Sequence, residues 1–174
     1  KWKRQGWVFK QDELPENCRG NQAFPFVLEN KKTSDPAKKY LLYFAVAPRP
    51  GEVYDKICWA YSRDGWHWNF GGTAIEGYGL DPLVLFQPNG MYVMFYTTVD
   101  KASFLVKKSL SNDGQKWSAP VTVVAKDTNR RGLYTIAGLY IDDQLALLLQ
   151  STTPAGRNEM LLYTAKGDGK LLPN

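Results

Sequence analysis

The chain has 174 residues, 44% hydrophobic and 22% charged, the composition of a folded globular protein and not of a disordered or fibrous one. Six Trp, ten Tyr and eight Phe make it 14% aromatic, which favours β structure. No apolar run approaches the ~20 residues that a membrane helix needs. The net charge of +5 comes from scattered Lys and Arg pairs and not from the clustered patch of a nucleic-acid-binding surface. We therefore expect neither a membrane nor a nucleic acid as partner.

Short apolar runs rich in aromatic residues follow one another along the chain, separated by Gly, Pro, Asn and Asp. Such runs predict β-strands, and no helical pattern of useful length interrupts them. The expected strands are 24–28, 40–44, 57–61 and 72–75, then 81–85, 91–96, 104–108 and 120–124, then 134–139, 145–149 and 160–163. Four short strands make one blade of a β-propeller, so the pattern predicts two blades and most of a third.

Two turn motifs mark the same position in the first two groups of strands. Residues 62–68 and 111–117, here called the first and second box, both read Ser-x-Asp-Gly-x-x-Trp and are offset by 49 residues. Propeller blades repeat about every 40 to 50 residues. Asp-Gly favours a tight hairpin because glycine tolerates positive φ and the aspartate accepts hydrogen bonds from nearby N–H groups. Residues 166–169 read Lys-Gly-Asp-Gly, a degenerate third copy of the box (the worn box) that lacks the tryptophan.

The expected fold class is all-β, with propeller-type blades of four antiparallel strands and about three blades in one domain over residues 1–174. The repeats are expected at about 20–75, 76–125 and 126–174. Segment 1–10 resembles the tail of a box and the strand after it, so it either closes the third blade or marks a piece cut from a longer propeller. Propellers typically have about four to eight blades, and a homodimer that completes a six-bladed ring is one solution.

The boxes resemble the Asp box of sialidases and the related turn of many glycosidase propellers. The resemblance implies that each box lies on the hairpin between the third and fourth strands of a blade, where Trp68 or Trp117 buries a large surface. Asp64 and Asp113 are then structural residues on the side away from any axial pocket. The Arg-Ile-Pro opening of sialidases is absent, since residues 23–25 read Ala-Phe-Pro.

Residues 79–96 resemble the first two strands of a blade in glycoside hydrolase families 43 and 32 and their relatives. The resemblance rests on an Asp-Pro pair at Asp81, an Asn-Gly turn at residues 89–90 and a Tyr-rich returning strand. It implies that Asp81 opens an innermost strand and points its carboxylate into a central pocket. A following proline suits a strand start because it has no N–H group.

Such enzymes use three cooperating carboxylates, and the chemistry needs at least two, because one is ionised while the other delivers a proton. This chain departs from that pattern, since Phe24 and Tyr134 occupy the slot of Asp81 in the other two units and no Glu opens the third. Acids on loops could stand in, and aromatic and Arg side chains could contact a sugar. The candidate set is Asp81, Glu76, Asp100 and Glu159 for catalysis, and Trp59, Tyr96, Arg19 and Tyr134 for substrate binding.

Few residues could serve other chemistry. His67 is the only histidine, so the chain has few side chains that could serve Ser-His catalysis or bind a metal ion. We therefore expect no metal and no cofactor. Cys18 and Cys58 fit no metal motif and are compatible with one disulfide or with two free thiols. The chain begins at Lys1, which fits a mature secreted or periplasmic form, a processed fragment or a trimmed chain.

Three functions remain open from the sequence. The first is a carbohydrate-active, glycoside hydrolase-like protein with Asp81 on the floor of a pocket lined by innermost strands. The second is a non-catalytic propeller that binds a glycan or a protein, which the missing acids favour. The third is an inactive propeller fragment. A propeller hosts many activities, so the fold does not choose among them.

Overall fold

The computed structural model describes residues 1–4, 6–100, 103–124 and 132–166, and in them eleven strands form three antiparallel sheets. The first sheet has the order β1-β2-β3-β4, the second β5-β6-β7-β8 and the third β9-β10-β11. The strands are β1 Gln22–Glu29, β2 Tyr40–Val46, β3 Lys56–Ser62, β4 Asn69–Glu76, β5 Leu80–Phe86, β6 Tyr92–Asp100, β7 Ser103–Ser111, β8 Val121–Val124, β9 Gly132–Ile141, β10 Gln144–Thr152 and β11 Asn158–Lys166. Three short 3-10 helices, η1 Gln11–Glu13, η2 Glu16–Cys18 and η3 Pro36–Lys38, are the helical elements of these residues. The all-β expectation of propeller-type blades is confirmed.

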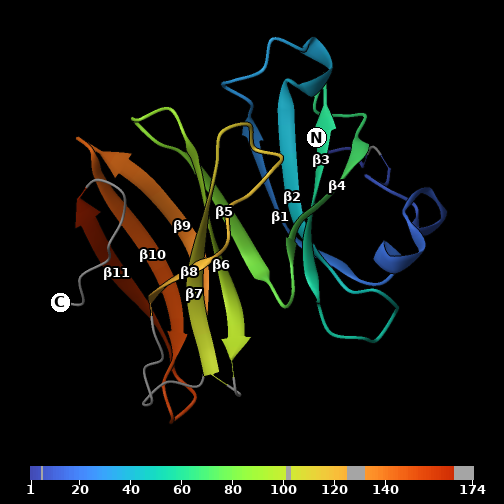
Figure 1. Cartoon of the computed structure of the whole chain (residues 1–174). Helices are drawn as coiled ribbons and strands as arrows, with labels where there is room; N and C mark the ends of the chain where they lie inside the picture. The colour runs from blue at the N-terminus through green and yellow to red at the C-terminus, as the bar shows by residue number, and fades with distance from the viewer. Residues whose placement is uncertain (5, 101–102, 125–131, 167–174) are drawn as a thin grey trace.

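The second sheet lies between the other two, and the sheets fan out like the blades of a partial propeller (Figure 1). The first strand of each sheet is innermost, because β5 contacts both β1 and β9. Two apolar clusters fill the spaces between sheets. One joins Leu83, Phe95 and Val106 of the second sheet to Leu145 and Leu147 of the third. The other joins the first and second sheets. It contains Leu41, Tyr43, Ile57 and Trp59 of the first sheet and Val84, Tyr92, Met94 and Tyr96 of the second.

Strand register divides the fold into two ends. At one end, here called the pocket end, the innermost strands begin and β4 ends at Glu76 opposite Lys56. The opposite end, here called the box end, carries both boxes. The first box is the turn between β3 and β4, and the second is the turn between β7 and β8. The two aspartates of the boxes therefore lie far along their blades from the starts of the innermost strands.

Both boxes form the same set of hydrogen bonds. In the first, Asp64 Oδ1 accepts from the backbone N–H groups of Trp66 (2.8 Å) and His67 (2.9 Å), while the Ser62 hydroxyl accepts from the Gly65 N–H (2.9 Å). In the second, the corresponding distances to Asp113 Oδ1 are 2.8 and 2.9 Å, and that to the Ser111 hydroxyl is 2.8 Å. The serine and aspartate thus hold the hairpin closed by satisfying N–H groups that no strand pairs.

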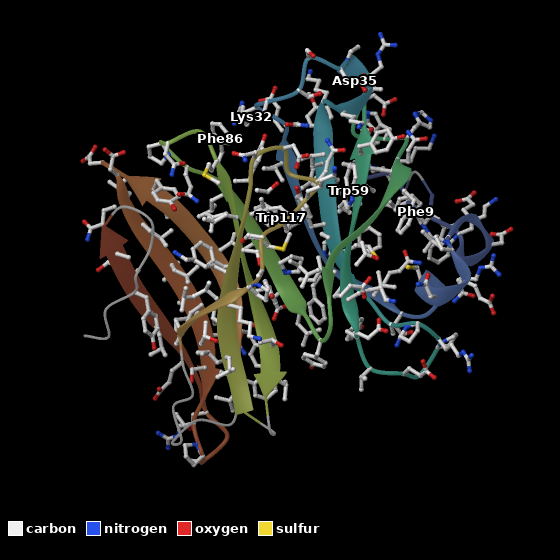
Figure 2. All side chains as sticks on the ribbon, in the orientation of Figure 1. Phe9, Lys32, Asp35, Trp59, Phe86 and Trp117 are labelled. Carbon is white, nitrogen blue, oxygen red and sulfur yellow. The ribbon has the colours of Figure 1, made fainter. Side chains whose placement is uncertain are left out.

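The N-terminal segment lies against the first sheet and not at the edge of the third. Residues 1–4 and 6–9 form no strand, and the Phe9 ring packs 5.8 Å from Phe44 and 6.4 Å from Phe70. Figure 2 shows Phe9 on the far side of the first sheet from the second sheet. Leu14 and Cys18 join the same buried cluster. This corrects the alternative in which segment 1–10 closes the third blade, because the apolar face of the first sheet binds it instead.

The third sheet, by contrast, presents apolar side chains to solvent. Leu139 and Ile141 of β9 and Met160 and Leu162 of β11 are exposed. The worn box at residues 167–169 lies outside the described residues. Among the described residues, no helix is long and apolar enough to cross a bilayer.

Candidate active site

A small hollow of about 140 Å³ lies at the pocket end between the three innermost strands. It is lined by residues 24–26 of β1, residues 81–83 of β5, and Thr135 and Ile136 of β9. At this point each innermost strand has a β-bulge, in which one extra residue shifts the register with the neighbouring strand. Such bulges bend a strand and re-aim a side chain, and they are common beside active sites.

Backbone strain is concentrated at the same place. Phe24 and Asp81 have φ values of 56° and 49°, in the left-handed region that residues other than glycine seldom adopt. Each departure costs on the order of 1 kcal/mol or more and persists only where the surrounding structure imposes it. In both strands a proline follows, at Pro25 and Pro82. In the first two blades the residue before this proline therefore has the same unusual conformation, as Phe24 in one and Asp81 in the other.

The Asp81 carboxyl group is half-buried and only partly paired. Its Oδ2 atom is buried and has no hydrogen-bond partner in the described part of the chain. Burial raises the pKa of Asp81 to about 6, although a hydrogen bond from Thr97 opposes the rise. The charged form is disfavoured because a buried carboxylate loses its hydration. Asp81 can therefore hold a proton at mildly acidic pH.

Two threonines fix Asp81 in place. Thr97 of β6 accepts a hydrogen bond from the backbone N–H of Thr135 (3.1 Å), which leaves the Thr97 hydroxyl proton for the Asp81 carboxylate. The Thr135 hydroxyl donates to the backbone carbonyl of Asp81. Thr135 of the third sheet thus holds the backbone of Asp81. Thr97 orients the Asp81 carboxyl group and is itself held by the Thr135 N–H.

Aromatic side chains lie near Phe24 and Asp81, two of the residues that line the hollow. The Phe24 and Tyr54 rings meet edge to face at 5.5 Å. Burial raises the pKa of Tyr78, and the nearby Tyr134, Asp81 and Tyr54 add to the rise, which places these four groups in one neighbourhood. Aromatic rings with a polar edge suit sugar binding because their faces stack on C–H groups while their hydroxyls form hydrogen bonds.

The other predicted acids lie at the pocket end but on different strands. Glu76 ends the outermost strand β4 and is exposed, and Glu159 lies on the outermost strand β11, opposite Ser151. Asp100 ends the middle strand β6, three residues beyond the partner of Leu80, and its side chain is outside the described part of the structure. Asp81 is the acid in the lining of the hollow.

The predicted substrate contacts divide in the same way. Trp59 is 7% exposed and Tyr96 is 2% exposed, both inside the cluster between the first two sheets, so they offer little surface to a ligand. Arg19 follows η2 and donates from Nε to the carbonyl of Leu14 (3.0 Å), away from the lining of the hollow.

Tyr134 is half-buried near the mouth of the hollow, with its ring 5.2 Å from Phe104. The register corrects its assignment to the slot of Asp81, since the extra residue of β9 is Ile136, two positions later. Three neighbours of Asp81 were not predicted, namely Tyr78, Thr97 and Thr135, and neither was Tyr54, which packs on Phe24. Thr97 and Thr135 come close to Asp81 through cross-strand and cross-sheet packing, for which a single sequence carries no direct signal.

Comparison with known proteins finds a similar fold in several solved structures of glycoside hydrolases. No family model matches the chain, and no curated protein matches it in sequence. Among solved structures, it resembles sucrose-6-phosphate hydrolase from Lactobacillus gasseri (15% identity, TM-score 0.67, 86% of this chain and 32% of that one). It also resembles a glycoside hydrolase (14% identity, TM-score 0.66, 94% of this chain and 51% of that one). A third similar structure is an α-L-arabinofuranosidase from Lactobacillus brevis (14% identity, TM-score 0.59, 74% of this chain and 46% of that one).

The chain spans between about one third and one half of the length of these three structures. At such low identity the likeness concerns the fold alone. This chain has part of a propeller-like fold that several glycoside hydrolases share.

Proposed function

We propose that this chain is a glycoside hydrolase-like, carbohydrate-active protein in which a sugar ring enters the hollow between the innermost strands. The observation that carries the proposal is Asp81, a strained, half-buried carboxyl group with one unpaired oxygen at the point where three sheets meet. Perturbed carboxyl groups in a cleft are frequent at catalytic sites. The fold shared with glycoside hydrolases supports the same substrate class.

Glycoside hydrolysis needs one carboxyl group that protonates the leaving oxygen and another that acts as base or nucleophile. With its pKa raised to about 6, Asp81 can carry a proton at mildly acidic pH and release it from the carboxyl group that lines the hollow. Thr97 would steady the carboxylate that remains. General acid catalysis works best when the pKa of the acid lies near the working pH.

The second carboxyl group is assigned to Asp100 within this proposal. It ends the strand that pairs with β5 and lies at the same end of the second sheet as Asp81. Glu76 and Glu159 are weaker candidates because both lie on outermost strands. Two strands separate Glu76 from the innermost strand of its sheet, and one strand separates Glu159 from that of the third sheet.

Kinetics on a panel of aryl glycosides test the proposal. Wild type is expected to hydrolyse at least one member, and Asp81→Asn to lower kcat about 100-fold or more, the usual contribution of a positioned acid or base. Asp113→Asn is the matched control, because it changes an aspartate of the same sheet at the box end. Equal turnover by wild type and Asp81→Asn would overturn the catalytic role.

A second candidate function is glycan binding without catalysis. It is favoured by the hollow's single carboxyl group and by its volume of about 140 Å³, below the roughly 300 to 1,000 Å³ of most ligand pockets. Binding of oligosaccharides on a glycan array without release of reducing ends would support this function over hydrolysis.

We propose further that a homodimer enlarges this pocket, because the exposed apolar face of the third sheet is available for contact with a second copy. Light scattering is expected to give twice the chain mass of 19.7 kDa. A monomer at all concentrations would contradict the dimer and leave the role of Asp81 open to the kinetic test.

A further inference from the structure

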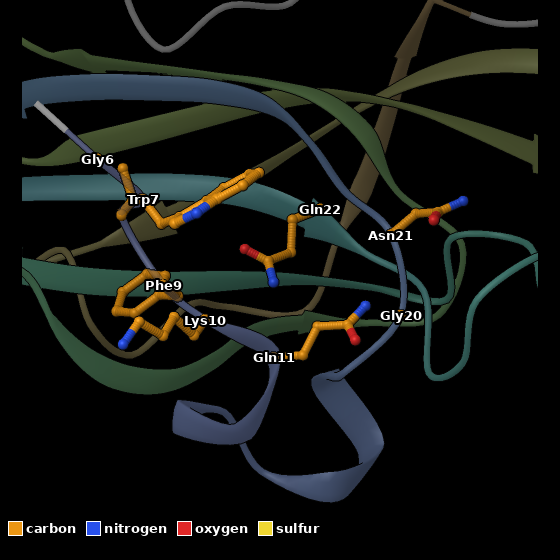
Figure 3. A pocket seen from close by; sticks show the side chains of 9 residues that line it. Gly6, Trp7, Phe9, Lys10, Gln11, Gly20, Asn21 and Gln22 are labelled. Atoms are coloured by element: carbon orange, nitrogen blue, oxygen red, sulfur yellow. The ribbon is translucent and has the colours of Figure 1, made fainter. Parts of the chain in front are cut away.

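A second and larger depression lies on the N-terminal segment, beside the first residues of β1. It has a volume of about 720 Å³ and is lined by residues 6–11 and 20–22. Figure 3 shows Trp7, Gln11 and Gln22 around it, with Phe9 and Lys10 on the same stretch of chain. We call it the N-terminal groove. Its volume falls in the range of small-molecule sites, five times that of the hollow at Asp81.

The chemistry of the groove is aromatic and amide. Trp7 is 74% exposed, although the Arg4 guanidinium lies 4.7 Å from the centre of its ring. Three carboxamides, those of Gln11, Asn21 and Gln22, line the same space, and in the described residues no side chain or backbone group hydrogen-bonds to them. The lining contains one cation, Lys10, and no carboxylate. A large exposed aromatic ring beside polar groups that are free to bond a ligand is a feature of binding surfaces.

We propose that the N-terminal groove binds an oligosaccharide of about two or three sugar units, the length that its volume admits. The Trp7 ring stacks on the apolar face of one sugar, while the carboxamides donate to and accept from hydroxyl groups. A carboxamide suits a hydroxyl because it offers both a donor and an acceptor.

The position of the groove supports a carbohydrate ligand over an isolated small molecule. Gln22 opens β1 at the pocket end, two residues before Phe24 of the hollow at Asp81. A sugar chain held in the groove therefore lies at the end of the molecule where the hollow opens. The proposal does not depend on catalysis by Asp81, because the two sites share no lining residue.

Calorimetric titration of the full chain with tetrasaccharides of glucose, xylose, arabinose and galacturonic acid tests the groove. At least one probe is expected to bind saturably, and Trp7→Ala to weaken that binding about tenfold or more, which corresponds to about 1.4 kcal/mol. Binding of the galacturonic acid probe alone assigns Lys10 to a sugar carboxylate, whereas binding of a neutral probe assigns the site to hydroxyl recognition.

Two variants keep the result specific. Trp66→Ala removes an equally exposed tryptophan, 69% exposed at the box end, and is expected to leave affinity unchanged. Asp81→Asn is expected to bind the probes as wild type does while losing turnover of aryl glycosides, so the groove and the catalytic proposal fail separately. Absence of binding by all four probes, or affinity that survives Trp7→Ala or falls with Trp66→Ala, would overturn the proposal.

An independent observation concerns the two cysteines, which meet where the N-terminal segment covers the first sheet. Cys18, at the end of η2, and Cys58, in the middle of β3, are both buried, and their Sγ atoms are 3.7 Å apart. A disulfide requires about 2.05 Å between sulfurs, and the two sulfur atoms already face each other in the buried cluster. Burial raises the pKa of both thiols, which makes them poor nucleophiles once the segment is in place.

We infer that Cys18 and Cys58 form a disulfide that fastens the N-terminal segment to the first sheet. The two thiols lose two protons and two electrons to an external disulfide such as oxidised glutathione, which is reduced to two thiols. Because the buried thiols react slowly, the bond forms during folding. An oxidising compartment favours such bonds, in keeping with a secreted or periplasmic location as a proposal.

Intact mass spectrometry after refolding with oxidised glutathione tests the bond. The chain is expected to weigh two hydrogen atoms less than its reduced form and to give no reaction with thiol reagents under denaturing conditions. Cys18→Ser is the control and is expected to show one reactive thiol. Two reactive thiols per wild-type chain after that refolding would overturn the inference.

Discussion

The two boxes have the same sequence pattern and the same hydrogen bonds but different surroundings. The first box is open, since Trp66 is exposed and a Cβ added at Gly65 would have no neighbour closer than 4.0 Å, the Cδ2 atom of Tyr40. The second box packs against the first sheet. There the Tyr43 hydroxyl donates to the Gly114 carbonyl (2.5 Å), and the Trp117 ring lies 5.7 Å from the Tyr43 ring.

The difference shows that the local sequence determines the conformation of the turn, whereas the neighbouring elements determine what the turn packs against. The second box has a preceding sheet to hold, and its Trp117 reaches that sheet. In the described residues no sheet precedes the first one, and Trp68 packs on the cluster that contains Phe9, Leu14 and Cys18. The N-terminal segment therefore covers the face of the first sheet that points away from the second.

Substituting the box glycines separates turn geometry from packing and should have the largest effect. Both have positive φ, 80° at Gly65 and 73° at Gly114, so Ala costs about 1 kcal/mol at either. At residue 114 the new Cβ would also lie 2.7 Å from Leu41 Cδ1 and 3.0 Å from the Tyr43 hydroxyl. We expect Gly114→Ala to lower the free energy of unfolding by about 2 to 4 kcal/mol, measured in urea, and Gly65→Ala by about 1 kcal/mol. Equal losses would mean that the second box does not pack as described.

The contact between box and sheet can be weakened through a single oxygen. Tyr43→Phe leaves the Gly114 carbonyl without its buried donor, which should cost about 1 to 2 kcal/mol. Tyr40→Phe, beside the open first box, is the control and should change the unfolding free energy by less than about 0.5 kcal/mol. A neutral Tyr43→Phe would show that water replaces the hydroxyl.

The contribution of Asp81 to stability should change with pH in the opposite direction to that of the box aspartates. Because its folded pKa is raised above that of an unfolded aspartate, the folded protein binds the proton more tightly, and stability falls as pH rises from about 4 to about 6. Asp81→Asn removes this loss and should raise the unfolding free energy at pH 7 to 8 by about 1 kcal/mol, after allowance for solvent screening of a half-buried group. No gain is expected at pH 4. A destabilised variant at pH 8 would contradict a raised pKa.

The box aspartates should show the smallest change at neutral pH. Every backbone hydrogen bond described for them goes to Oδ1, and asparagine keeps one carbonyl oxygen. Hydrogen bonds from His67 hold the pKa of Asp64 well below its usual range. Burial alone would raise that of Asp113, but the amides of Lys116 and Gln115 outweigh it and lower the pKa.

Each box carboxylate therefore adds stability that is present above about pH 4 and lost as pH falls through the folded pKa. Asp64→Asn and Asp113→Asn should leave urea midpoints at pH 7 nearly unchanged and flatten the decline in stability between about pH 4 and pH 2. An unchanged acid decline in both variants would refute the depressed pKa values.

The strand order and the box hairpins were accessible from the sequence because their signals are local. Short apolar runs and the turn residues between them predicted every strand found in the described residues, and the resemblance of residues 79–96 to glycoside hydrolase families implied that Asp81 opens an innermost strand. What the sequence did not show depends on packing between distant segments. Thr97 and Thr135 reach Asp81 only through register and sheet contact.

The N-terminal segment illustrates the same limit. Its apolar and aromatic residues suit the exposed face of either the first or the third sheet, and nothing local decides between them. The same holds for β9. Aligning the repeats by sequence placed Tyr134 at the position of Asp81, but the bulge of β9 is at Ile136, two residues later.

Sugar turnover and binding in three aspartate variants test the central claim most directly. The account predicts that Asp81→Asn abolishes hydrolysis of aryl glycosides without loss of stability, while Asp64→Asn and Asp113→Asn retain the rate of the wild type. Loss of activity in a box variant that is still folded, unchanged activity in Asp81→Asn, or a wild type that neither hydrolyses nor binds any sugar would contradict it.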